Sequence, residues 1–218
     1  ETPTEGLKNA IQKILSTDSD TVRSITSTVL SSDMSATVIN EKETIYFASL
    51  VETYPDDPGL LLFLLMNFVT LEPGDFLYVS PGITHAYLRG NVVEITSNSD
   101  NVIRCGLTPK HVNAHEFLSI ASFVSEKPEI QTPAESVHTY ESPTPFTLTR
   151  LNLNEELEAT LHGPEILIST QNNFTITNKS ENSFHVEQGH PVWVPYSDTS
   201  YKITGNCLLF RCATNPHF

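Results

Sequence analysis

Five side chains that can do chemistry lie within residues 85–110 of this 218-residue chain. They are a possible metal ligand, an aromatic ring, a carboxylate and two cations, namely His85, Tyr87, Glu94, Arg104 and Lys110. A neutral imidazole is a common zinc ligand, and a carboxylate with a tuned pKa can transfer protons. A guanidinium keeps its proton and can stabilise a developing anion, while a flexible ammonium suits a phosphate. Together these groups predict a site that acts on a small anionic ligand.

A β-hairpin would bring two of these groups together. If Arg89-Gly90 is a two-residue loop between two short strands, His85 faces Glu94 in the pairing. Directly opposed residues share one face of a sheet, so the imidazole and the carboxylate would lie side by side, with Tyr87 two residues along. A three-residue loop would send Glu94 to the other face. An interior with these polar groups suits a ligand cavity better than a plain core, because unpaired buried polar groups are costly.

Each of these residues, taken singly, also has a simpler interpretation. A lone histidine in a strand is usually structural, and a strand glutamate usually faces solvent. Arg104 could pair with Asp100 across a turn, and Lys110 could be solvated. Their combination within one short segment favours a functional site.

The charge balance limits the classes of partner. Asp and Glu outnumber Lys and Arg by 26 to 12, which gives a net charge of −14. This charge argues against nucleic acid and against anionic membranes as partners, because both would be repelled. A phosphorylated small molecule needs only a local basic pocket. The longest apolar run, residues 60–66, is too short to cross a membrane, and three cysteines without a metal-type cluster indicate a reducing, cytoplasmic setting.

Helical periodicity dominates the start of the chain, and strand-like periodicity the remainder. Apolar spacing predicts helices over residues 7–15, 22–29 and 41–53. Short strands separated by Gly, Pro and Asn turns are expected at residues 60–70, 76–79, 85–88, 92–96, 147–152, 165–170, 174–177, 191–194, 200–203 and 208–212. Short strands at regular spacing are typical of a β-sandwich or barrel.

The central segment also resembles a known family. His85-Ala-Tyr-Leu-x-Gly, Glu94 and Ser99-Asp-Asn-Val-x-Arg-x-Gly-Leu-Thr-Pro-Lys110 closely resemble the signature of type I mannose-6-phosphate isomerases. The resemblance spans most of the chain, and it is weak over the first forty residues. It extends to Tyr54-Pro-Asp, Leu71-Glu-Pro-Gly-Asp, Gly163-Pro-Glu-Ile-Leu, Val194-Pro and Leu209-Phe-Arg.

The resemblance implies a zinc-dependent cupin enzyme that interconverts mannose 6-phosphate and fructose 6-phosphate. By resemblance, His85 is one of four zinc ligands and Glu94 is a proton-transfer or positioning residue at the metal. Arg104 stands at the catalytic arginine, Lys110 at a substrate or phosphate contact, and Tyr87 lines the sugar pocket. The implied chemistry is proton transfer between adjacent sugar carbons through an enediol.

The expected fold is mainly β, with cupin jelly-roll barrels and an N-terminal α-helical subdomain. The expected domains are a helical subdomain over 1–54, strands completing the catalytic cupin over 55–124, a linker over 125–145 and a C-terminal cupin-like β-domain over 146–218.

Three zinc ligands of the family have no counterpart in this sequence. The family takes them from a Gln-x-His motif and a His-Lys-Pro-Glu motif in its N-terminal half. The Gln-x-His of this chain, Gln188-Gly-His190, lies in the C-terminal β-region instead, and Glu126-Lys-Pro-Glu129 lacks the histidine. We therefore expect the chain to be the C-terminal portion of an isomerase that is active only together with the N-terminal half of the same protein. The alternatives are a non-catalytic cupin that binds a sugar phosphate and a related zinc cupin isomerase acting on another sugar phosphate.

Overall fold

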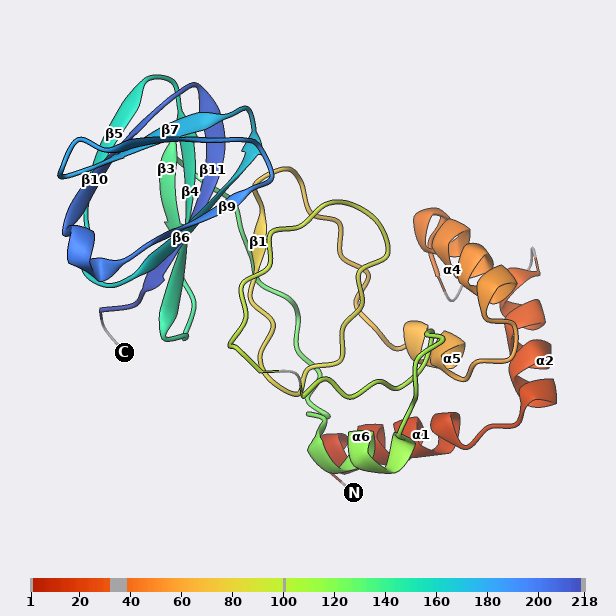
Figure 1. Ribbon diagram of the computed structural model, residues 1–218. Helices are drawn as coiled ribbons and strands as arrows, with labels where there is room; N and C mark the ends of the chain where they lie inside the picture. The colour runs from red at the N-terminus through yellow and green to blue at the C-terminus, as the bar shows by residue number, and fades with distance from the viewer. Residues whose placement is uncertain (1, 32–38, 100, 217–218) are drawn as a thin grey trace. The chain divides into compact units, whose positions relative to one another are not determined.

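The computed structural model describes residues 2–31, 39–99 and 101–216, and the chain divides into two compact units. Unit 1 comprises residues 1–70, 79–91 and 98–128, and unit 2 comprises residues 71–78, 92–97 and 129–218. Each unit has its own hydrophobic core. The labelled helices belong to unit 1 and the labelled strands to unit 2 (Figure 1).

All three helices expected near the start of unit 1 are present. They are α1 (Pro3–Leu15), α2 (Ser19–Leu30) and α4 (Glu41–Thr53). Each begins after a side chain that accepts a hydrogen bond from a backbone N–H of the first turn, and these side chains are Thr2, Asp18 and Asn40. Glu5 and Glu43 complete capping boxes on α1 and α4 by accepting the N–H of the cap residue. Local capping therefore explains where these helices start.

Helix α5 (Gly59–Phe63) stands where the sequence predicted the beginning of a strand, so that prediction was wrong. The Asp-Asp-Pro-Gly turn continues directly into helical hydrogen bonds, since Leu60 N–H donates to the Asp57 carbonyl at 3.0 Å and Leu61 N–H to the Pro58 carbonyl at 2.9 Å. An apolar run alone does not distinguish a buried helix from a buried strand. The run enters the core of unit 1, whose buried members are Val22, Val29, Ile39, Phe47, Leu60 and Leu61.

The segments 85–88 and 92–96 are irregular, so the predicted strands and the hairpin pairing between them are not formed. A two-stranded hairpin is marginal without further strands or a packed face beside it. Among the described residues, no strand pairs with either segment. The nearest short strand, β1 (Phe76–Leu77), pairs instead with β2 (Ile130–Gln131). Helix α6 (Ala114–Ile120) follows in unit 1, with the Asn113 side chain accepting the Glu116 N–H.

Besides the two-stranded β1-β2 sheet, unit 2 contains a sandwich of two antiparallel sheets, which confirms the mainly β architecture for this part of the chain. The five-stranded sheet has the order β3-β4-β11-β6-β9, and the four-stranded sheet has the order β5-β10-β7-β8. The strands are β3 (Val137–Tyr140), β4 (Phe146–Leu153), β5 (Glu156–Thr160), β6 (Glu165–Gln171), β7 (Phe174–Asn178), β8 (Ser183–Val186), β9 (Pro191–Val194), β10 (Ser200–Thr204) and β11 (Cys207–Thr214).

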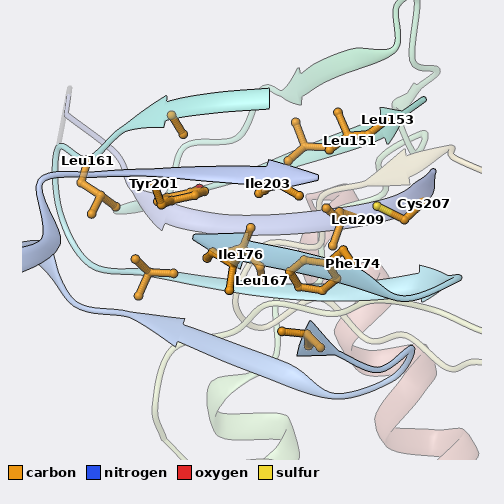
Figure 2. Packing of buried hydrophobic residues seen from close by; sticks show 13 residues of the cluster. Leu151, Leu153, Leu161, Leu167, Phe174, Ile176, Tyr201, Ile203, Cys207 and Leu209 are labelled. Atoms are coloured by element: carbon orange, nitrogen blue, oxygen red, sulfur yellow. The ribbon is translucent and has the colours of Figure 1, made fainter. Parts of the chain in front are cut away.

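The core of unit 2 forms where alternate residues of the two sheets point inward. Figure 2 shows Leu151, Leu167 and Leu209 from the five-stranded sheet and Ile176 and Ile203 from the four-stranded sheet within this cluster. Burying a leucine or isoleucine side chain fully contributes roughly 1.5–3 kcal/mol, so these residues make a major contribution to the stability of the sandwich.

Each of the six strands predicted after residue 146 is present in the sandwich. The sequence analysis missed β5 and β8. Each of these strands has only one buried residue, beside four exposed or half-exposed residues in β5 and three exposed residues in β8. It also missed β2 and β3, which lie within the expected linker at 125–145. Among the described residues, no helix combines the length and the apolar content that crossing a membrane would require.

Candidate functional site

His85 and Tyr87 lie on the irregular segment 79–91 of unit 1, and both residues are exposed. Their ring centroids are 5.8 Å apart with an interplanar angle of 68°. The Nδ1 atom of His85 lies 2.9 Å from the Ile83 carbonyl oxygen. Because a carbonyl only accepts hydrogen bonds, Nδ1 carries the proton in this contact, and a neutral imidazole then presents the Nε2 lone pair. This geometry suits a metal ligand whose tautomer is set by a backbone carbonyl.

Glu94 lies in the segment 92–97, which belongs to unit 2. The structure therefore brings His85 and Tyr87 together within unit 1, while the role of Glu94 beside the imidazole stays a prediction.

Arg104 and Lys110 lie on one loop of unit 1, before α6. Arg104 is half-buried and Lys110 is exposed. Asp100, the alternative partner proposed for Arg104, lies outside the described residues. Within the part of the chain that the structure describes, no carboxylate forms an ion pair with either cation. Two positive charges on a chain of net charge −14 thus share one loop.

The carboxylate of Asp57 fastens this loop to the turn before α5. One oxygen, Oδ1, accepts the Gly59 N–H at 2.8 Å, and the other, Oδ2, accepts the Leu107 N–H at 2.7 Å. Hydrogen bonds to an ionised acceptor are roughly twice as strong as neutral ones. The second bond joins residues that are 50 positions apart, and Leu107 lies midway between Arg104 and Lys110.

Two glycines let the loop 104–110 approach the turn before α5 closely enough for these bonds, and we call this contact the junction. A Cβ atom on Gly106 would lie 2.6 Å from the Asp57 carboxylate and 2.9 Å from the Gly59 Cα atom. A Cβ atom on Gly59 would lie 2.9 Å from the same carboxylate. Leu107 has a φ of +52°, a left-handed conformation that costs a non-glycine residue roughly 1–2 kcal/mol. The Leu107 side chain packs against the core of unit 1, which offsets part of this cost.

The junction also shapes the environment of Cys105. Burial raises the pKa of the Cys105 thiol, and the negative charge of Asp57 raises it further. A hollow of about 440 Å³ lies beside it, lined among others by Asp56, Asp57, Cys105 and Gly106. The lining contains two aspartates and no lysine or arginine. The hollow is therefore poorly suited to an anionic ligand.

A zinc site is not complete within the described residues. No group of three or more His, Cys, Asp or Glu side chains there could hold a metal ion. A structural or catalytic zinc needs at least three protein ligands. His85 can supply one of them, so the described residues do not fit zinc without ligands from elsewhere.

Asp57 is the functional candidate that the sequence did not single out. It was visible only as part of an Asp-Asp-Pro-Gly turn, where aspartate commonly caps the following backbone N–H groups. Its bond to Gly59 follows from that local pattern. Its bond to Leu107 has no local signal.

Comparison with known proteins places the chain beside one group of enzymes. A mannose-6-phosphate isomerase from Salmonella typhimurium is 32% identical over 168 residues, which cover 73% of this chain and 42% of the relative. The isomerase from Rattus norvegicus is 28% identical over 178 residues, covering 74% of this chain and 42% of the relative. The chain thus spans about 42% of the length of these curated relatives. No family model matches the chain.

Solved structures show the same fold. The apo form of mannose 6-phosphate isomerase from Salmonella typhimurium matches with a TM-score of 0.79 at 22% identity, over 97% of this chain and 55% of that chain. A structure of the same enzyme bound to its substrate and zinc also matches with a TM-score of 0.79, over the same shares of the two chains. The resemblance read from the central motif is thereby confirmed.

Proposed function

We propose that this chain, which is related to the mannose-6-phosphate isomerases, carries part of the active site of an aldose–ketose isomerase. The reaction would interconvert mannose 6-phosphate and fructose 6-phosphate by proton transfer through an enediol. The observation that carries this proposal is the loop 104–110, whose two cations lie on either side of the turn that Asp57 holds. Curated relatives named mannose-6-phosphate isomerase, at about 30% identity, support this substrate class.

Each residue of the proposed site has a role that its chemistry supports. The guanidinium of Arg104 would stabilise the negative charge of the enediolate, and the ammonium of Lys110 would bind the phosphate. Glu94 would transfer or position the proton, and Tyr87 would line the sugar pocket. His85 would be one zinc ligand through Nε2, since its Nδ1 is engaged by the Ile83 carbonyl.

Zinc is the proposed cofactor, and it would supply a Lewis acid next to the sugar oxygens. The zinc-bound structure named above supports this assignment. Because His85 alone cannot hold zinc tightly, the remaining ligands would come from further residues of the same protein, its N-terminal half. The isolated chain would then be inactive.

We also propose the finer architecture and setting. Residues 55–124 would complete a catalytic cupin after the helical subdomain 1–54, and residues 146–218 would form a second cupin-like domain, to which β3 of the segment 125–145 also belongs. The two-sheet sandwich of unit 2 supports the second domain. A cytoplasmic setting is supported by three free cysteines, Cys105, Cys207 and Cys212.

The test is an assay of the full-length gene product with mannose 6-phosphate in deuterated water. Isomerisation through an enediol predicts formation of fructose 6-phosphate, incorporation of solvent deuterium at the carbon that receives the proton, and loss of turnover with a zinc chelator. Other aldose phosphates tested in parallel would reveal an isomerase with a different substrate.

The alternative is a protein that binds a sugar phosphate without converting it. The observation that favours it is the lack of a complete metal-ligand group among the described residues. Saturable binding of mannose 6-phosphate to the full-length protein, with no zinc and no turnover, would support this alternative over the isomerase.

A further inference from the structure

We infer that Asp57 is a positioning residue of the proposed sugar-phosphate site, because its carboxylate holds the turn that places Arg104 and Lys110. This inference rests on the proposed function. Asp57 itself belongs to the turn before α5 and carries no role in the reaction described above.

Asp57 fastens the middle of the cation-bearing loop. Both oxygens of its carboxylate are used, one by Gly59 N–H at 2.8 Å and one by Leu107 N–H at 2.7 Å. Leu107 lies three residues after Arg104 and three residues before Lys110. An extended chain covers about 3.3–3.6 Å per residue, so the backbone of each cation is tethered within roughly 11 Å of this one anchor.

The loop conformation at the anchor needs such a restraint. Gly106 has a φ of +149° and Leu107 a φ of +52°, and the latter is disfavoured for leucine. The close approach of Gly106 to Asp57 and Gly59 leaves no room for a side chain at position 106. Without the carboxylate, Leu107 would lose its hydrogen-bond acceptor while keeping an unfavourable backbone conformation. The turn would then relax, and both cations would move with it.

This geometry makes a specific kinetic prediction. A shift of Lys110 weakens the contact with the phosphate and raises KM, while a shift of Arg104 removes stabilisation of the enediolate and lowers kcat. Loss of Asp57 moves both cations, so both parameters change together. A purely structural role would lower the amount of folded enzyme and leave KM unchanged.

The experiment replaces Asp57 by asparagine in the full-length gene product. D57N preserves the size of the side chain but exchanges one acceptor oxygen for an NH₂ group, so one of the two backbone N–H groups loses its partner. D56N is the matched control, because the neighbouring carboxylate is half-exposed and its ion pair is with Arg23 on α2. We expect D57N to lower kcat/KM for mannose 6-phosphate at least tenfold, with a raised KM and faster hydrogen exchange at the Leu107 amide. D56N should match the wild type.

Three outcomes would contradict this expectation in different ways. D57N with wild-type kcat and KM in an active enzyme overturns the role of Asp57 and leaves the proposed function standing. Loss of activity at unchanged KM, in proportion to the loss of folded protein, also overturns positioning. A wild-type protein without isomerase activity overturns the proposed function, and this inference with it.

Discussion

The phenol of Tyr201 donates a hydrogen bond of 2.5 Å to the Oε2 atom of Glu165 inside the sandwich of unit 2. The two residues come from facing sheets, since β10 belongs to the four-stranded sheet and β6 to the five-stranded sheet. Both side chains are buried, with relative exposures of 3% for Tyr201 and 5% for Glu165. A buried carboxylate is costly unless hydrogen bonds compensate for the lost water. This pair therefore links the two sheets by a polar contact within an apolar core.

Replacing Tyr201 by phenylalanine should destabilise the chain by about 1–3 kcal/mol, because Glu165 would lose its buried donor. Urea unfolding followed by circular dichroism measures this loss. Tyr196→Phe is the control, since Tyr196 is 59% exposed and should unfold as the wild type does. Equal stability of the two variants would show that the buried bond contributes nothing.

Stability should fall at alkaline pH. Burial raises the pKa of Tyr201 well above its ordinary value, and the hydrogen bond to Glu165 raises it further, while burial also raises the pKa of the Cys207 thiol. The folded state thus keeps protons that the unfolded state loses above about pH 9 for a thiol and about pH 10 for a phenol. The contribution is fully present below these values and is lost above them, by about 1.4 kcal/mol per pH unit for each group.

Urea midpoints measured between pH 7 and pH 11 check this prediction. The stability of the wild type should be steady up to about pH 9 and then decline. Y201F should decline less steeply above pH 10, because it has one titrating group fewer. A parallel slope in the two proteins would rule out Tyr201 as a source of the decline.

Gly106→Ala should be more destabilising than Gly90→Ala. Both glycines have positive φ, +149° and +125°, so both variants should lose about 1–2 kcal/mol from backbone strain. A Cβ atom at position 90 meets nothing within 4 Å, whereas one at position 106 meets Asp57 and Gly59. Overpacking should add about 1–3 kcal/mol to the loss in G106A alone. Thermal or urea unfolding of the two variants gives the comparison, and equal losses would mean that the junction is loose.

Lys110→Gln should raise KM for mannose 6-phosphate in the full-length gene product. Loss of a charge-assisted bond costs about 1.5–3 kcal/mol, which corresponds to roughly a 10- to 100-fold change. Lys127→Gln is the control, because Lys127 is also exposed and lies in unit 1 outside the proposed site. Steady-state kinetics separates KM from kcat, and a K110Q enzyme with wild-type KM would exclude Lys110 as the phosphate contact.

Local chemistry predicted much of the regular structure. Helix α4 begins and ends where the sequence indicated, because the Asn40 cap and the Tyr54-Pro55 stop are local signals. The six predicted strands of the sandwich followed from alternation of apolar residues between turn residues. The strands expected at 85–88 and 92–96 failed for a different reason, because a strand forms only where another strand pairs with it.

The sequence by itself determined which reactive groups are available and which family they resemble. Arg104, Lys110 and His85 were recognised by residue type, spacing and motif. Only the tertiary structure decided what holds the cation-bearing loop, since the bond from Leu107 to Asp57 joins residues 50 positions apart and no local pattern encodes it. The same holds for Tyr201 and Glu165, whose contact exists because two sheets pack face to face. Periodicity and capping act over a few residues, whereas the partners of a buried carboxylate are set by packing between segments distant in sequence.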